Sequence, residues 1–104
     1  MKNPNPLEKD IEKKVCDYAK SLGCLVYKFT SPSRRSVPDR LFIFPNGAIR
    51  FVEFKRAGAK TTPAQEVEIQ KILKQGVGVW VVDNVSSGKV LVDQMFKRYS
   101  LSDF

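Results

Sequence analysis

Segments in which apolar residues recur every three or four positions alternate along the chain with short apolar segments. This pattern predicts an alternation of helices and strands. Residues 7–22 are predicted to form a helix, because their apolar side chains recur at three- and four-residue steps and make one stripe. The members of this stripe are Leu7, Ile11, Val15, Tyr18 and Leu22. Gly23 follows as a helix stop. The opposite side of the helix is heavily charged, so we expect the stripe to be core or a dimer face.

Three short apolar segments after this helix are predicted to be strands. They span residues 24–29, 39–44 and 49–55. A polar, basic loop over 30–38 separates the first two strands, and Pro45-Asn46-Gly47 connects the second and third as a turn. Residues 56–61 are predicted to form a loop.

The second half of the chain begins with a helix-start signal. Thr62 suits the N-cap, Pro63 the first helical position, and Gln65 the third position of a capping box. This helix is predicted to run to about Gln75 and to end at Gly76. The apolar run over 77–83 predicts a strand in the centre of the sheet. Residues 86–98 are predicted to form a final helix, with a strand over 89–92 as the alternative because glycine and β-branched residues disfavour helix.

The predicted order is helix, three strands, helix, strand and final helix, which is typical of an α/β fold with a mixed sheet flanked by helices. The 104 residues are enough for one domain with a modest core, so we interpret 1–104 as a single domain. The polar N-terminus has no apolar signal core, and no apolar run is long enough to span a bilayer. We therefore expect a cytoplasmic protein.

Charge and residue usage narrow the possible functions. The formal net charge of +7 favours a polyanionic partner, most often nucleic acid. The chain contains no histidine, which excludes every mechanism that uses an imidazole base. Cys16 and Cys24 are interpreted as reduced core residues, because two thiols without histidine make a poor zinc site. Catalysis in this chain would therefore depend on carboxylates, lysine and a metal.

The hairpin formed by the second and third strands places charged residues together. A three-residue turn at Pro45-Asn46-Gly47 sets Phe44 opposite Ala48, so facing residues have numbers that sum to 92. Asp39 then faces Glu53, and Lys55 lies on the same side two residues later. A two-residue Asn-Gly turn would instead set Asp39 opposite Phe54 and separate the cluster.

Two neighbouring carboxylates repel each other unless a cation lies between them, and oxygen ligands suit Mg²⁺ or Mn²⁺. Such a metal can activate water and neutralise charge at a phosphodiester, and Lys55 can stabilise the transition state. The alternative is a cross-strand charge cluster on the surface. Two features favour the metal site: Asp39 follows the basic loop, and Glu53 lies in the apolar strand Phe51-Val52-Glu53-Phe54.

These motifs resemble the PD-(D/E)XK nuclease signature and, more narrowly, the virus-type replication-repair nuclease (VRR-NUC) family. The resemblance rests on Val37-Pro38-Asp39-Arg40 followed by Phe51-Val52-Glu53-Phe54-Lys55. It extends over nearly the whole chain, and Ser36 departs from a glycine usual in the family. The resemblance implies a restriction-endonuclease-like core and a stand-alone nuclease domain.

By this resemblance, Asp39 and Glu53 are metal ligands, the carbonyl of Phe54 is a further ligand, and Lys55 is the catalytic lysine. The family also has a glutamate on the first helix near the metal, for which Glu8 and Glu12 are candidates. Glu8 lies roughly 50° from the centre of the apolar stripe and Glu12 roughly 90°, so Glu8 is favoured.

Gln65 matches a family position near the lysine, although its role in the capping box is an equal alternative. Several residues on the loops flanking Asp39 and Lys55 are candidate DNA contacts. These are Lys28, Ser31, Arg34, Arg35, Arg56 and Lys60.

The resemblance implies a Mg²⁺- or Mn²⁺-dependent DNA endonuclease. Stand-alone members resemble Holliday-junction resolvases, which act as homodimers on branched DNA, and a short chain favours recognition of DNA shape over base sequence. The alternatives are a nuclease or nickase on ordinary duplex DNA and a non-catalytic nucleic-acid-binding module. The sequence alone does not choose between a bacterial and a phage host.

Overall fold

The computed structural model describes residues 7–33 and 36–102, and within them the predicted order of elements is confirmed. The helices are α1 (Glu8–Ser21), α2 (Pro63–Lys74) and α3 (Val85–Ser102). The strands are β1 (Leu25–Lys28), β2 (Arg40–Ile43), β3 (Ile49–Phe54) and β4 (Gly78–Val82). The final element is a helix, and the alternative strand over 89–92 is not formed.

The four strands form one mixed sheet in the order β1-β2-β3-β4. β1, β2 and β3 are antiparallel neighbours, whereas β4 runs parallel to β3. The prediction that the last strand is central was wrong, because β4 lies at an edge of the sheet. Its apolar sequence reflects helices packed against it, since both α2 and α3 contact β4.

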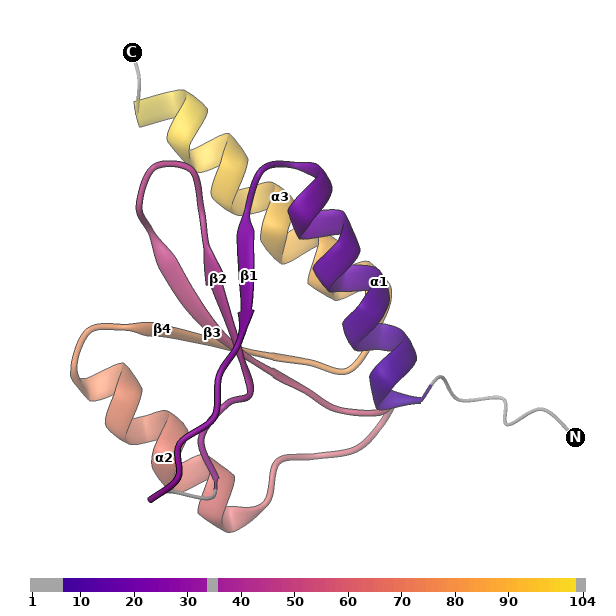
Figure 1. Cartoon of the computed structure of the whole chain (residues 1–104), viewed down its shortest axis with the longest axis vertical. Helices are drawn as coiled ribbons and strands as arrows, with labels where there is room; N and C mark the ends of the chain where they lie inside the picture. The colour runs from indigo at the N-terminus through magenta and orange to yellow at the C-terminus, as the bar shows by residue number, and fades with distance from the viewer. Residues whose placement is uncertain (1–6, 34–35, 103–104) are drawn as a thin grey trace, which may run out of the picture.

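The helices form two layers around the sheet. α1 and α3 lie side by side on one side of the sheet, and α2 lies on the other side against β4 (Figure 1). The core lies between the sheet and the α1–α3 layer. Large side chains that are fully buried there include Phe42, Phe44, Val52 and Phe54. Trp80 is partly buried against this core and packs edge-on against Phe42 and Phe44.

The apolar stripe of α1 is core at its centre and exposed at its ends. Ile11 and Val15 are almost completely buried, whereas Leu7 and Leu22 are 42% and 40% exposed. The predicted stripe is therefore correct for its middle turns only, since Leu7 and Leu22 are the cap residues at the two ends of α1. Cys16 and Cys24 are free and buried, as expected for core thiols.

The turn between β2 and β3 has the predicted three-residue form. The Phe44 N–H donates to the Ala48 carbonyl at 2.8 Å, and Gly47 adopts a left-handed φ of +92°. The ladder pairs Arg40 with Val52 and Ile43 with Ile49. The predicted register is thus confirmed, and it determines which charged residues meet at the far end of the hairpin.

Two further local features fix the remaining helices. α2 begins with the predicted capping box, in which Thr62 and Gln65 exchange two hydrogen bonds. α3 packs closely at Gly88, where an added Cβ would lie 2.7 Å from Val15 Cγ2 and 3.0 Å from Val82 Cγ1. Among the described residues, no helix is both long and apolar enough to cross a membrane.

Candidate active site

Asp39 and Glu53 are brought to the same end of the sheet by the β2–β3 register. Asp39 lies one residue before β2, and its backbone carbonyl accepts a hydrogen bond from the Phe29 N–H at 2.8 Å. Glu53 lies near the end of β3, one position beyond the pair Arg40–Val52. The two acidic residues therefore occupy facing positions, as the sequence predicted.

Glu53 is a charged residue in an apolar setting, with only 6% of its surface exposed. Burial and the nearby Asp39 carboxylate raise the pKa of Glu53 from its ordinary value of 4.5 to about 7, against an opposing effect of Lys55. Glu8 and Glu12 contribute smaller parts of this rise. The site therefore concentrates negative charge where solvent stabilises it poorly.

Asp39 carries an unsatisfied buried oxygen. Its Oδ1 has no hydrogen-bond partner among the residues that the structure describes. Burial raises the pKa of Asp39 above its ordinary value, and so does Glu12, while Arg40 and Lys28 lower it. A buried acceptor without a donor costs free energy, so this oxygen is suited to binding a cation or a donor from a ligand.

The first helix contributes two acidic residues, and the structure distinguishes them. Burial and Asp39 raise the pKa of Glu8, while Lys55 lowers it, so Glu8 belongs electrostatically to the cluster. Glu12 is held in an ion pair, since Arg40 Nε donates to Glu12 Oε2 at 2.7 Å. Glu12 also raises the pKa of Asp39 and Glu53, so the choice of Glu8 as the metal-binding carboxylate of the helix stays a prediction.

Lys55 follows directly after β3 and keeps contact with the sheet. Its backbone N–H donates to the Val82 carbonyl at 2.9 Å, which continues the β3–β4 ladder past Phe54. The Lys55 ammonium lowers the pKa of both Glu8 and Glu53. The amine thus balances part of the carboxylate charge and lies at the same end of the sheet.

The donor atoms at this site fit a hard divalent cation. Asp39 and Glu53 offer carboxylate oxygens, and Mg²⁺ is commonly bound through one or two carboxylates. Over residues 7–33 and 36–102, no three Asp, Glu, His or Cys side chains come together closely enough to hold one ion. The arrangement therefore suits a site with two carboxylates and other oxygen ligands, with Glu8 nearby.

Gln65 lies outside this electrostatic cluster in its observed interactions. Its Oε1 accepts from the Thr62 N–H at 2.9 Å, and its own N–H donates to Thr62 Oγ1 at 3.1 Å. The side-chain carbonyl therefore accepts one hydrogen bond within the cap, and the amide –NH₂ can donate to a ligand. This favours a donor role over a metal-ligand role for Gln65.

The predicted DNA contacts are placed unevenly. Lys28 is close enough to Asp39 to lower its pKa, and it lies at the end of β1. Arg56 and Lys60 are exposed on the loop after β3, and Ser31 is half-buried on the loop after β1. Arg34 and Arg35 lie outside the described residues. Among the predicted DNA contacts that the structure describes, Lys28 is the one whose charge lowers the pKa of Asp39.

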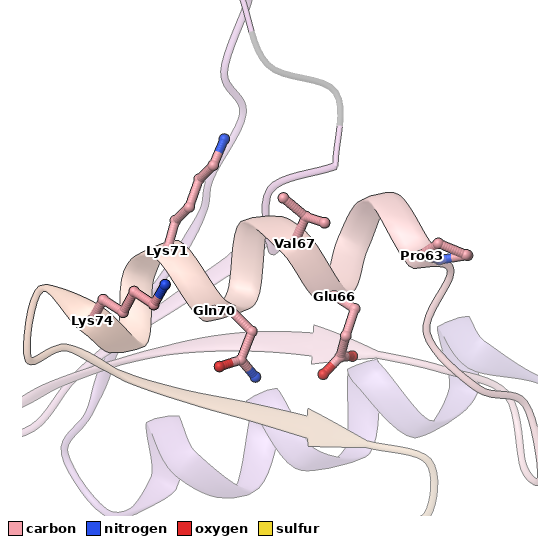
Figure 2. Close-up of a pocket in the computed structure, with 6 residues that line it drawn as sticks. All are labelled: Pro63, Glu66, Val67, Gln70, Lys71 and Lys74. Atoms are coloured by element: carbon pink, nitrogen blue, oxygen red, sulfur yellow. The ribbon is translucent and has the colours of Figure 1, made fainter.

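The structure also shows two features that the sequence did not predict. The Glu12–Arg40 ion pair joins residues 28 positions apart, and no local pattern indicates such a contact. An open groove of about 510 Å³ runs along α2 (Figure 2). It is lined by Pro63, Glu66, Val67, Gln70, Lys71 and Lys74. Of the predicted site residues that the structure describes, none lines this groove.

Comparisons with known proteins support a nuclease relationship. The chain is 43% identical over 84 residues to "Putative nuclease p44" of Acyrthosiphon pisum secondary endosymbiont phage 1, covering 81% of this chain and 90% of that protein. A solved structure described as "VRR_NUC domain" superposes with a TM-score of 0.76 at 33% identity, covering 88% of this chain and 96% of the other. No protein-family model matches the chain.

A second solved structure, described as "VRR_NUC domain protein", has a TM-score of 0.72 at 17% identity, which shows the shared fold alone. It covers 89% of this chain and 90% of its own. Fold and relatives together define an α/β domain of the nuclease class. The chain belongs to the virus-type replication-repair nuclease family, VRR-NUC.

Proposed function

We propose that this protein is a Mg²⁺- or Mn²⁺-dependent DNA endonuclease that hydrolyses phosphodiester bonds at the Asp39–Glu53–Lys55 cluster. The observation that carries the proposal is the facing pair of carboxylates, one nearly buried and one with an unsatisfied oxygen. A fold keeps such a pair at a free-energy cost, which a ligand can offset. The relative named as a nuclease supports the reaction class.

Asp39, Glu53 and the carbonyl of Phe54 would hold the cation, and Glu8 would act from the adjacent helix. When bound, a divalent cation supplies positive charge at the scissile phosphate and lowers the pKa of water. The chain's own carboxylates hold that site in a fixed place beside the sheet. Their raised pKa values mean that they bind protons readily without a cation, so cation binding competes with protonation.

Lys55 would stabilise negative charge that develops on the phosphate during hydrolysis and would orient the attacking water. This role is supported by the effect of the Lys55 charge, which lowers the pKa of both Glu8 and Glu53. The amide of Gln65 would donate to the water or to the substrate from the start of α2. These groups act by position and charge, without an imidazole base.

The DNA backbone would approach the site along basic residues on both flanking loops. Lys28 supports this path, since it lies close to Asp39. Ser31, Arg34 and Arg35 would contact phosphates on one side, and Arg56 and Lys60 on the other. The net charge of +7 favours such contacts. We place this activity in the cytoplasm of a bacterial or phage-infected cell.

For the substrate, we propose branched DNA of the Holliday-junction type, cut by a homodimer. Two active sites related by a two-fold axis suit symmetric cleavage of a four-way junction. A domain of 104 residues has little surface for reading a base sequence, which favours recognition of shape. This substrate choice rests on the family resemblance and on chain size.

A cleavage assay separates the proposal from its alternatives. With Mg²⁺ or Mn²⁺ present, we expect the protein to cut a four-way junction faster than linear duplex of the same sequence at equal enzyme concentration. Equal cutting of both would favour a duplex nuclease or nickase over a resolvase. Binding without cleavage of either substrate would indicate a non-catalytic binding module and would contradict the proposed activity.

A further inference from the structure

Glu12 and Arg40 form an ion pair between α1 and β2, the two elements next to the predicted site. Arg40 Nε donates to Glu12 Oε2 at 2.7 Å, and the two side chains are only 24% and 20% exposed. Arg40 is the first residue of β2 and directly follows Asp39. Glu12 lies one helical turn after Glu8 on α1. The pair therefore links the strand that carries one acidic residue to the helix that carries another.

The direction of Arg40 explains how the link reaches α1. Arg40 pairs with Val52, and facing residues in a ladder point to the same side of the sheet. Val52 is fully buried in the core beneath the α1–α3 layer. Arg40 consequently points toward α1 at the edge of that core, where Glu12 meets it.

The apolar contacts of α1 do not by themselves fix how the helix is rotated. Ile11, Val15 and Ala19 hold it on the sheet, but the hydrophobic effect is non-directional. A charge-assisted hydrogen bond is directional and short. The Glu12–Arg40 bond therefore limits rotation of the first turns of α1 relative to the start of β2, where Arg40 directly follows Asp39.

We propose that Glu12 and Arg40 form a positioning pair, which fixes the start of β2, and with it Asp39, against the first turns of α1 for cation binding and hydrolysis. This inference rests on the proposed nuclease function. Arg40 has a second effect, because its positive charge balances the negative charge of the Glu12 carboxylate next to an acidic site. Loss of Arg40 alone would leave that carboxylate without its ion-pair partner, whereas loss of both charges would not.

The test compares Glu12→Ala, Arg40→Gln and the double variant with wild type. Cleavage is measured as kcat and KM on the junction, and Mn²⁺ affinity is measured separately by calorimetry without DNA. A misplaced catalytic group can lower the rate by about tenfold to a hundredfold, so we expect kcat to fall by about that much in each single variant. We expect weaker Mn²⁺ binding, an unchanged KM and melting temperatures close to wild type.

Two further variants distinguish positioning from simple stabilisation. The double variant should be no worse than Arg40→Gln alone, because coupled partners are not additive and the uncompensated charge is gone. Arg40→Lys should restore part of the rate. The control is the ion pair Lys13–Asp17 on the same helix, whose side chains are 77% and 54% exposed. Removal of that pair should leave kcat and Mn²⁺ affinity unchanged.

The inference is overturned if the single variants keep wild-type kcat and Mn²⁺ affinity. It is also overturned if their losses follow melting temperature alone, or if the Lys13–Asp17 control loses as much. A wild-type protein that cuts no DNA would overturn the proposed function and this inference together. Active wild type with unaffected variants would overturn only the positioning role.

Discussion

Asp39 and Glu53 face each other across the β2–β3 hairpin, one position beyond the pair Arg40–Val52. Glu53 is nearly buried, and Asp39 Oδ1 is buried without a hydrogen-bond partner among the described residues. Two acidic groups in this setting oppose folding when both are ionised. The relationship therefore has consequences for stability as well as for catalysis.

The first prediction concerns the metal-free stability of Glu53→Gln. The folded-state pKa of Glu53 is raised from 4.5 to about 7, so the folded protein binds this proton more tightly than the unfolded chain. Stability of the metal-free wild type should then fall as pH rises from about 4.5 to about 7. Glu53→Gln should remove this loss and be more stable at pH 8 by roughly 1–3 kcal/mol.

Urea unfolding at pH 5 and pH 8, with and without Mn²⁺, measures this effect. Mn²⁺ should stabilise wild type at pH 8 and stabilise Glu53→Gln much less. Glu66→Gln is the matched control, because Glu66 is exposed and its amide replacement can still accept from Thr61 Oγ1. A wild-type stability that rises between pH 5 and pH 7 because of Glu53 would contradict the electrostatic account.

The second prediction concerns Gly88 in α3. Alanine is a better helix former than glycine, yet an added Cβ would lie 2.7 Å from Val15 Cγ2. Gly88→Ala should therefore lower stability by about 1–3 kcal/mol through overpacking. Val15→Ala combined with Gly88→Ala should lose less than the sum of the two single losses, and exposed Ser86→Ala should change little. A more stable Gly88→Ala would show that the contact relaxes at no cost.

Gly88 also shows where sequence reasoning reaches its limit. The chain pattern correctly predicted the middle turns of the α1 core stripe from local spacing, and the hairpin register from the turn at Pro45-Asn46-Gly47. Gly88 weakened the prediction of α3, since a missing Cβ can indicate a helix break or a close contact. Only the tertiary contact with Val15 distinguishes the two.

The remaining differences have the same origin in long-range packing. The apolar sequence of β4 was taken to indicate a central strand, but strand order depends on which segments pair, and β4 pairs only with β3 in the described sheet. Glu12 and Arg40 meet because α1 packs on the side of the sheet to which Arg40 points, which no periodicity encodes. The sequence could thus predict the facing carboxylates but could not predict the ion pair beside them.

The third prediction separates the two roles of Gln65. Thr62→Ala removes the N-cap acceptor but keeps Gln65, whereas Gln65→Ala removes one hydrogen bond of the capping box and the amide. Each variant should lose about 1 kcal/mol of stability through the cap. If the amide also contacts water or substrate, Gln65→Ala alone should lower kcat. Equal activity of the two variants would limit Gln65 to capping.

The fourth prediction concerns salt and DNA binding. Most contacts should be to phosphates, so affinity should fall steeply between low and moderate salt. Lys28→Ala should reduce the slope of log affinity against log salt by about one unit if Lys28 contacts a phosphate. Lys97 is an exposed lysine on α3, and Lys97→Ala should leave the slope unchanged. A flat salt dependence of wild type would contradict a basic DNA path.

The central claim is that Asp39 and Glu53 form the hydrolytic site, and parallel cleavage and binding assays on Asp39→Ala and Glu53→Ala test it most directly. With Mg²⁺ present, both variants should lose cleavage of the four-way junction while binding it within a few-fold of wild type. Asp39→Asn should behave in the same way, because it keeps the side-chain size and removes the charge. Cleavage retained by either alanine variant would contradict the assignment.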